Sequence, residues 1–136
     1  MAYPDLRGNE MKYVVDCIET EWVSSQGPYV RRFEEAFAEW TGIPHAVTCS
    51  SGTAALHLAL VALGIGPGDE VIVPSMTYVA SANAVAYVGG DVVLVDSDPD
   101  SLNVTPQAVA AAVTDRTKAV IPVDLYGMPI DVPALR

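Results

Sequence analysis

Basic residues are scarce in this sequence. Seven Lys and Arg stand against seventeen Asp and Glu in 136 residues, which gives a formal net charge of −10. A surface of this sign repels the phosphate backbone of nucleic acids, so we expect no nucleic-acid partner. We interpret the acidic excess as a source of solubility.

Cysteine, histidine and long apolar runs are equally scarce. The two cysteines, Cys17 and Cys49, and the two histidines, His45 and His57, show no zinc-ligand spacing. No apolar run approaches the ~20 residues of a membrane span, and charged residues interrupt the first ten positions where a secretory leader would lie. We therefore expect a soluble, cytoplasmic protein with free thiols, no metal site and no membrane contact.

What is present is a largely apolar chain with alternating strand and helix patterns. Hydrophobic residues make up 51% of it, enough for a real core. Strands are expected at His45–Cys49, Glu70–Pro74, Asp91–Asp96 and Lys118–Val123, with helices at Thr53–Gly64, Tyr78–Val88 and Pro106–Val113. This alternation predicts a three-layer α/β fold with a largely parallel sheet. The helix at 53–64 is apolar nearly all round, which predicts a central position.

The first part of the chain has a different pattern. Helices are expected at Asn9–Trp22 and Tyr29–Trp40, with Gly42 ending the second one. We therefore divide the chain into an N-terminal helical segment, 1–43, and the first part of an α/β large domain, 44–136. Residues 133–136 resemble the start of another helix, so we expect a truncated chain.

The turn at Ser51, Gly52 and Thr53 is the most informative local pattern. An apolar strand ends in small polar residues and an apolar helix begins at once. Free backbone N–H groups and the positive end of the helix dipole meet there, and glycine permits close approach of a ligand. The pattern is typical of a phosphate site. The alternative is a helix capped by Ser or Thr without any ligand.

Tyr78 follows the next strand and opens the next helix. In a parallel sheet, ligands bind outside the carboxyl ends of the strands. Tyr78 is therefore placed to stack on a planar ring. The alternative is that Tyr78 packs between helix and sheet.

These motifs together resemble the DegT/StrS family of sugar aminotransferases. The segments that carry the resemblance are Trp22–Pro28, Phe33-Glu34, Ser50–Leu56, Gly68–Pro74, Thr77-Tyr78, Val95-Asp96, Asn103-Val104, Thr117–Val123 and Leu125–Gly127. They occur in order and cover nearly the whole chain. The ordered set is far more specific than any single motif in it.

The resemblance implies the large domain of a fold-type I enzyme that depends on pyridoxal 5'-phosphate and is normally a homodimer. It implies transamination of a nucleotide-linked keto-sugar to an amino-sugar, with glutamate as amino donor. Carried over from the family, the cofactor-binding residues are Ser51, Gly52, Thr53 and Tyr78, and the substrate-binding residues are Ser24, Ser25 and Gly27.

The sequence departs from the family in its lysines. The chemistry needs a lysine Schiff base and a carboxylate on the pyridine nitrogen. Neither Lys12 nor Lys118 occupies the family's Schiff-base position, so we expect no catalytic residue here and no activity from this chain alone. Asp96 and Asp124 lie outside the family's pyridine-binding motif, and Asp96 is the better placed for a role in the site.

Two other functions are compatible with parts of the pattern. A Rossmann-type dinucleotide-binding domain would use Asp96 for ribose, but its glycine turn should lie about 20 residues earlier, whereas Gly52 lies 44 positions before Asp96. A non-catalytic binding or regulatory fragment is the other alternative. Its exposed sheet edge would favour aggregation.

Overall fold

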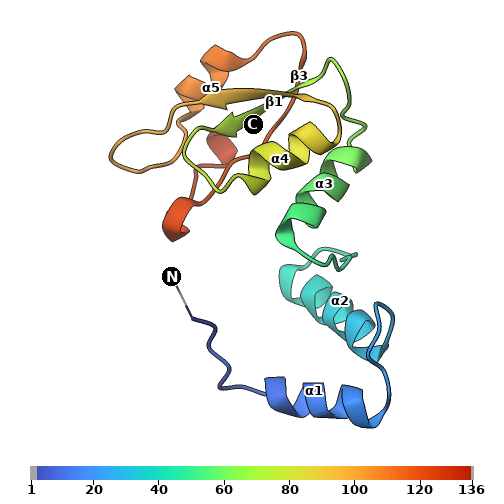
Figure 1. Cartoon of the computed structure of the whole chain (residues 1–136). Coiled ribbons are helices and arrows are strands. Elements are labelled where there is room, and N and C mark those ends of the chain that lie inside the picture. Colours follow the sequence, from blue (N-terminus) through green and yellow to red (C-terminus); the bar gives the residue numbers. More distant parts are fainter. Residues whose placement is uncertain (1–2, 136) are drawn as a thin grey trace. The chain divides into compact units, whose positions relative to one another are not determined.

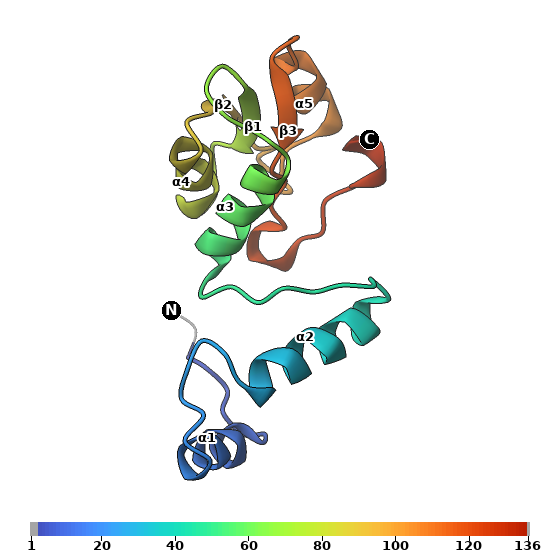
Figure 2. The ribbon, with the colours of Figure 1, turned by 90° about the vertical axis from the view of Figure 1, so that its right-hand side faces the viewer.

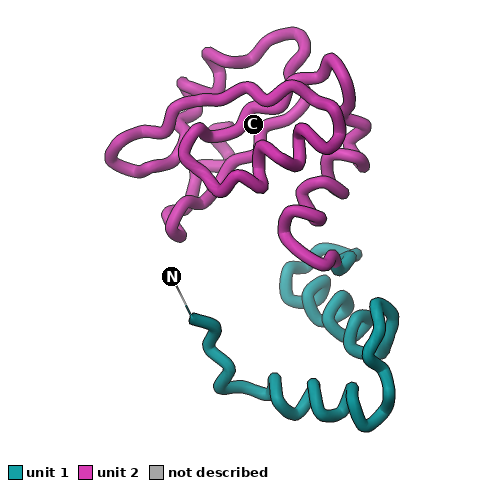
Figure 3. Tube along the Cα trace, viewed as in Figure 1, with its two compact units in different colours: residues 1–48 teal, residues 49–136 magenta. Residues whose placement is uncertain are grey.

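The computed structural model describes residues 3–135 (Figure 1). They form two compact units, which divide between Thr48 and Cys49 (Figure 3). We call residues up to 48 unit 1 and residues from 49 onward unit 2. The boundary predicted at 43/44 stays a prediction about the domains of the protein.

Unit 1 contains two helices, α1 (Glu10–Glu19) and α2 (Pro28–Thr41). The Tyr29 hydroxyl donates to Asp16 at 3.0 Å, and the Arg32 guanidinium lies 4.8 Å from the Tyr29 ring centre and 5.5 Å from that of Tyr13. Burial, followed by the Asp16 carboxylate, raises the pKa of the Tyr29 phenol. These contacts connect α1 to α2.

The end of α2 agrees with the sequence pattern. Gly42 adopts φ 70°, a left-handed conformation that glycine reaches without steric cost. Beyond it, the Glu34 carboxylate accepts from the Thr48 backbone N–H at 2.8 Å and from the Thr48 hydroxyl at 2.9 Å. The backbone bond first, and then the hydroxyl bond, lowers the pKa of Glu34. Glu34 thus attaches the segment after α2 to the helix.

The expected strand at His45–Cys49 is wrong for this structure, where the segment is irregular. A strand needs a neighbour to complete its hydrogen-bond ladder. All the strands in the described part of the chain lie between residues 70 and 120, and the Thr48 N–H is taken by Glu34. Within the described residues no strand pairs with this segment, so its apolar pattern alone does not make it a strand.

Unit 2 alternates helix and strand, as predicted. Its elements are α3 (Gly52–Ala62), β1 (Glu70–Pro74), α4 (Ala80–Tyr87), β2 (Asp91–Val95), α5 (Pro106–Ala112), β3 (Thr117–Val120) and the short 3₁₀ helices η1 (Leu125–Gly127) and η2 (Pro133–Leu135). Across residues 3–135 no helix combines the length and the apolar character needed to cross a membrane.

The three strands found in the described residues form one parallel sheet in the order β2-β1-β3. Val71 pairs with Val92 on one side and with Ala119 on the other. All five residues of the central strand β1 are buried, as its continuous apolar run predicts. The parallel direction places the carboxyl ends of the strands at one edge of the sheet.

Helices cover both faces of the sheet (Figure 2). On one face α3 and α4 pack over Val71 and Val73 of β1, with Leu60 and Val85 in the core. On the other face α5 packs over Ile72 and Val95, with Val104 and Val109. The three-layer α/β architecture predicted from the sequence is therefore confirmed.

The prediction that the apolar helix α3 is central is not met in this unit. Leu60 is its one fully buried residue, and Leu58, Val61 and Leu63 remain 48%, 55% and 68% exposed. The reason is that α3 packs mainly against α4 and leaves its other sides open. The apolar composition of a helix shows how many of its faces can be buried. It does not show which neighbouring elements bury them.

At the amino edge of the sheet, a buried carboxylate joins two strands. Glu70, 5% exposed, opens β1. It forms an ion pair with Arg116 and accepts from the Thr114 hydroxyl. Arg116 also contacts Asp91 at 3.2 Å. This edge lies opposite the carboxyl ends of the strands, so the cluster serves the fold.

Candidate functional site

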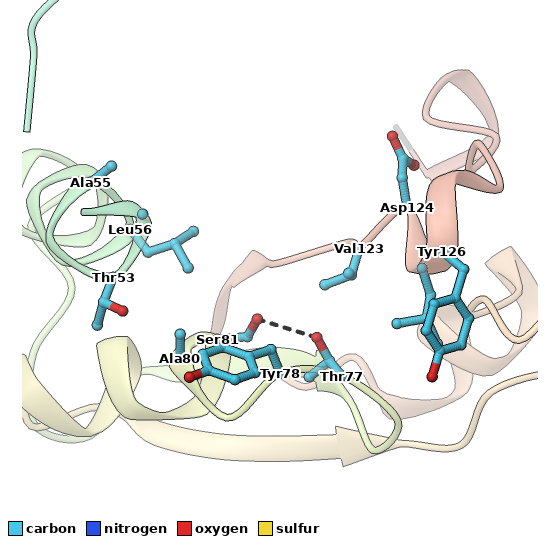
Figure 4. A pocket seen from close by; sticks show the side chains of 12 residues that line it. Thr53, Ala55, Leu56, Thr77, Tyr78, Ala80, Ser81, Val123, Asp124 and Tyr126 are labelled. Carbon is cyan, nitrogen blue, oxygen red and sulfur yellow. Dashed lines mark hydrogen bonds between the residues drawn. The ribbon is translucent and has the colours of Figure 1, made fainter. Parts of the chain in front are cut away.

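A pocket lies at the carboxyl edge of the sheet in unit 2 (Figure 4). Its volume is about 670 Å³, within the range of sites for small molecules. Its lining comes from the start of α3, the loop leading into α4 and the segment after β3: Gly52, Thr53, Ala55, Leu56, Thr77, Tyr78, Ala80, Ser81, Val123, Asp124, Leu125 and Tyr126. Three segments far apart in sequence thus meet at the edge where parallel sheets bind ligands.

The first wall is the beginning of α3. Ser51 is its N-cap, and the Ser51 hydroxyl accepts from the Ala54 N–H at 3.2 Å. The Ser51 carbonyl accepts from the Ala55 N–H at 3.0 Å. Within residues 3–135 the Gly52 and Thr53 N–H groups have no protein acceptor. Both stay available at the positive end of the helix dipole.

The space beside Gly52 is open. A Cβ added to Gly52 would meet no atom within 4 Å, so protein atoms do not require glycine there. A ligand that lies against the backbone would require it. Open space, two free N–H groups and the neighbouring Ser and Thr hydroxyls together fit a phosphate group.

The second wall carries Tyr78. Its side chain is 78% exposed, which argues against the alternative that it packs between helix and sheet. Figure 4 draws its ring between Thr53 and Tyr126. The Thr77 and Ser81 hydroxyls, 3.4 Å apart, join the two sides of the turn that carries it. Tyr78 therefore offers a free aromatic face to the pocket.

The third wall, Val123 to Tyr126, was not predicted from the sequence. A signal was available, because Asp124 and Tyr126 follow a strand at its carboxyl end. Asp124 lines the pocket, although the sequence argument preferred Asp96. The Asp96 carboxylate instead accepts from the Ser75 hydroxyl at 3.1 Å, at the ends of β2 and β1.

The expected substrate-binding residues Ser24, Ser25 and Gly27 all lie in unit 1, in the break between α1 and α2. The Ser24 hydroxyl accepts from the Gln26 N–H at 3.4 Å. Ser24 also lines a hollow of unit 1 together with Trp22. Gly27 is the N-cap of α2 in an extended conformation.

Neither lysine contributes to the pocket of unit 2. Lys12 belongs to α1 of unit 1. Lys118 is exposed and lies near the amino end of β3, beside a different hollow. In the described part of the chain no group of three or more His, Cys, Asp or Glu side chains could hold a metal ion.

Comparison with known proteins gives one consistent result. Residues 4–136 match the family described as the DegT/DnrJ/EryC1/StrS aminotransferase family. Over 131 residues the chain is 56% identical to the GDP-perosamine synthase of Caulobacter vibrioides, a match that covers 96% of the chain and 35% of that enzyme. The chain thus spans about a third of the length of such relatives.

Solved structures that are similar to this chain include aminotransferases as well. An aminotransferase from Psychrobacter cryohalolentis matches with a TM-score of 0.91 and 38% identity, over 99% of this chain and 34% of that one. NtdA from Bacillus subtilis, solved with bound cofactor PMP (pyridoxamine phosphate), matches with a TM-score of 0.86 and 34% identity, over 92% of this chain and 28% of that one.

Proposed function

We propose, since this chain belongs to the DegT/DnrJ/EryC1/StrS aminotransferase family, that the protein transfers an amino group from an amino acid to the keto group of a nucleotide-linked sugar. The observation that carries the proposal is the pocket of unit 2. It combines an open helix N-terminus with an exposed tyrosine ring at the carboxyl edge of a parallel sheet. The dinucleotide-binding alternative is not favoured, because the matched family is one of aminotransferases.

The substrate is proposed to be a sugar linked to guanosine diphosphate. The support is the 56% identity to a GDP-perosamine synthase, and identities of 48% and 50% to enzymes of the same name from Escherichia coli O157:H7 and Vibrio cholerae. Glutamate is the proposed amino donor, from the family resemblance of the sequence.

Pyridoxal phosphate is the proposed cofactor, and the residues of the pocket fit it. Its phosphate would accept from the free N–H groups of Gly52 and Thr53, with the Ser51 and Thr53 hydroxyls beside them. Its ring would stack on Tyr78. When bound, the cofactor supplies an electron sink for the bonds of the reacting carbon. The tasks of this chain are to bind the phosphate and to orient the ring.

The substrate side of the proposal rests on unit 1. Ser24, Ser25 and Gly27 are proposed to contact the sugar nucleotide, because they lie in the segment that resembles the family. The Ser24 and Ser25 side chains are exposed, so their hydroxyls are free to meet a polar substrate.

The proposal extends to the assembly and the compartment. A homodimer follows from the family resemblance. Cytoplasmic location is compatible with Cys17 and Cys49, which are both free thiols, since thiols persist in a reducing compartment.

The test is cofactor binding followed by reduction. The purified chain is mixed with pyridoxal phosphate, its absorbance is recorded before and after borohydride, and its intact mass is measured. We expect reversible binding without a reduced adduct, because neither Lys12 nor Lys118 lines the pocket. An adduct on either lysine would overturn the assignment of both as bystanders. No binding at all by the purified chain would overturn the proposed function.

A further inference from the structure

A buried amide holds the third wall of the pocket. Asn103 is 5% exposed. The Asn103 Oδ1 accepts from the Leu125 N–H at 3.2 Å, and its Nδ2 donates to the Met128 carbonyl at 2.8 Å. One side chain therefore binds both ends of the turn that contains Tyr126, more than twenty positions away in sequence.

Asn103 is itself firmly placed. The Asn103 carbonyl accepts from the Asp98 N–H at 2.9 Å, and its N–H donates to the Ser101 hydroxyl at 3.3 Å. The next residue, Val104, is 5% exposed and packs in the core under α5. Asn103 thus connects the turn to the rigid part of the sheet.

The turn keeps Tyr126 in an unusual conformation. Tyr126 has φ 53° and ψ 22°, in the left-handed region that residues with a Cβ rarely adopt. The neighbouring bonds close the turn: the Gly127 N–H donates to the Asp124 carbonyl at 3.1 Å, and the Met128 N–H to the Leu125 carbonyl at 3.0 Å. Such strain persists only where the surroundings impose it, and it is concentrated at functional sites.

The strained residue gains little from packing against the described part of the chain. Tyr126 is 84% exposed, yet it lines the pocket. In Figure 4 it stands across from Thr53, with Tyr78 drawn between them. A large aromatic ring carried on a backbone that is held in this way, with its face free, is suited to contact a ligand.

We infer that Tyr126 is a ligand-contacting residue and that Asn103 is the positioning residue that holds it. This rests on the proposed function: if the phosphate binds at Gly52 and Thr53 and the ring on Tyr78, Tyr126 is the remaining aromatic side chain of the pocket lining and would contact the ring. Tyr126 then recognises the ring and not the phosphate. Asn103 acts on the ligand indirectly, through the backbone of the turn that carries Tyr126.

The binding of two ligands to the protein separates a contact with the pyridine ring from a contact with the phosphate. Dissociation constants are measured by equilibrium dialysis for pyridoxamine phosphate, which needs no Schiff base, and for inorganic phosphate. We expect Tyr126→Ala to weaken pyridoxamine phosphate binding about three- to tenfold, the range of one aromatic contact. Phosphate binding should not change. Tyr126→Phe should retain most of the wild-type affinity.

A double-mutant cycle tests the link to Asn103. Asn103→Ala should weaken pyridoxamine phosphate binding as Tyr126→Ala does, and the double variant should be no weaker than either single variant. If Asn103→Ala does not fold, Asn103→Asp replaces it, because it keeps the acceptor for Leu125 and loses the donor to Met128. Thermal unfolding of each variant identifies simple loss of fold.

The outcomes are distinct. Additive effects of the two substitutions would overturn the role of Asn103. Unchanged affinity in Tyr126→Ala, or an equal loss for both ligands, would overturn the role of Tyr126 while leaving the proposed function in place. A wild-type protein that binds no pyridoxamine phosphate would overturn the proposed function and this inference with it.

Discussion

At the scale of single residues, the account depends on which atoms the pocket leaves free. Gly52 and Thr53 present N–H groups without acceptors in the described structure. Tyr78 and Tyr126 present rings that are 78% and 84% exposed. Exposed aromatic rings in a concave site contribute little to folding and are available to contact a ligand.

Gly52→Ala separates binding from stability. The new Cβ meets no protein atom, and alanine lowers the entropy of the unfolded chain, so the free energy of unfolding should rise by about 0.4–1 kcal/mol. The same Cβ would enter the space assigned to the phosphate, so phosphate affinity should fall about tenfold. Chemical unfolding and equilibrium dialysis measure the two effects.

Gly64→Ala is the matched control. Gly64 also faces open space but has φ 72°, so alanine there should destabilise the protein without changing phosphate affinity. Equal phosphate affinity in wild type and Gly52→Ala would refute the phosphate site at the start of α3.

Tyr78 gives a second test at this scale. Tyr78→Ala removes the proposed stacking surface, so pyridoxamine phosphate affinity should fall about three- to tenfold. The free energy of unfolding should change by less than about 0.5 kcal/mol, because the side chain is largely exposed. Titration of the variant with pyridoxamine phosphate measures the affinity, and its chemical unfolding curve measures the stability. A large loss of stability with intact binding would favour packing as the role of Tyr78.

At the scale of elements, two carboxylates connect segments that the sequence pattern treats separately. Glu34 joins α2 to Thr48, and Glu70 joins β1 to Arg116 and Thr114. Both are acidic residues whose partners come from a different part of the chain, which no local pattern reveals.

The Glu34 contact should depend on pH. Its pKa lies below the ordinary 4.5 because the Thr48 N–H, and then the Thr48 hydroxyl, donate to the carboxylate. A lowered pKa means that the contact stabilises the folded state above the unfolded value and is lost as pH falls through the folded one. The Thr48 amide resonance should therefore shift with a midpoint below pH 4.5. In Glu34→Gln this titration should be absent; if it persists, another group is responsible.

Removing Arg116 should weaken the sheet. Arg116→Ala leaves the buried Glu70 carboxylate without its ion pair, although Arg116 is 60% exposed and solvent screens it. We expect a loss of about 1–2 kcal/mol in the free energy of unfolding. Arg31→Ala removes an exposed pair with Glu35 and should cost less than about 0.5 kcal/mol. Equal losses in both variants would contradict the structural role of Glu70.

Local patterns explain most of the elements. The β1 bounds were predicted residue for residue, because the apolar run Val71–Val73 is short and lies between turns. Helices were placed to within about three residues at either end, with Gly42 as the stop signal. The strand at 45–49 and the burial of α3 were wrong, because each depends on a neighbour that sequence periodicity cannot supply.

At the scale of the whole molecule, the parallel sheet is what assembles the site. Three turns more than twenty residues apart become neighbours because β1, β2 and β3 run in the same direction. Of the residues predicted from the sequence to bind the cofactor, Gly52, Thr53 and Tyr78 line the pocket, on two of its three walls. The sequence argument missed Tyr126, whose importance appears only in its strained backbone and its position in the pocket.

The most direct measurement is amino transfer by the whole protein, because we expect no activity from these 136 residues alone. It is supplied with pyridoxal phosphate, ¹⁵N-labelled glutamate and a GDP-linked keto-sugar, and the sugar nucleotide is analysed by mass spectrometry. The account predicts an amino-sugar nucleotide that carries the ¹⁵N label, formed in wild type and strongly reduced in a variant that combines Gly52→Ala with Tyr78→Ala. Label in the product at the same rate in that variant, or no labelled product from the wild type with cofactor bound, would contradict it.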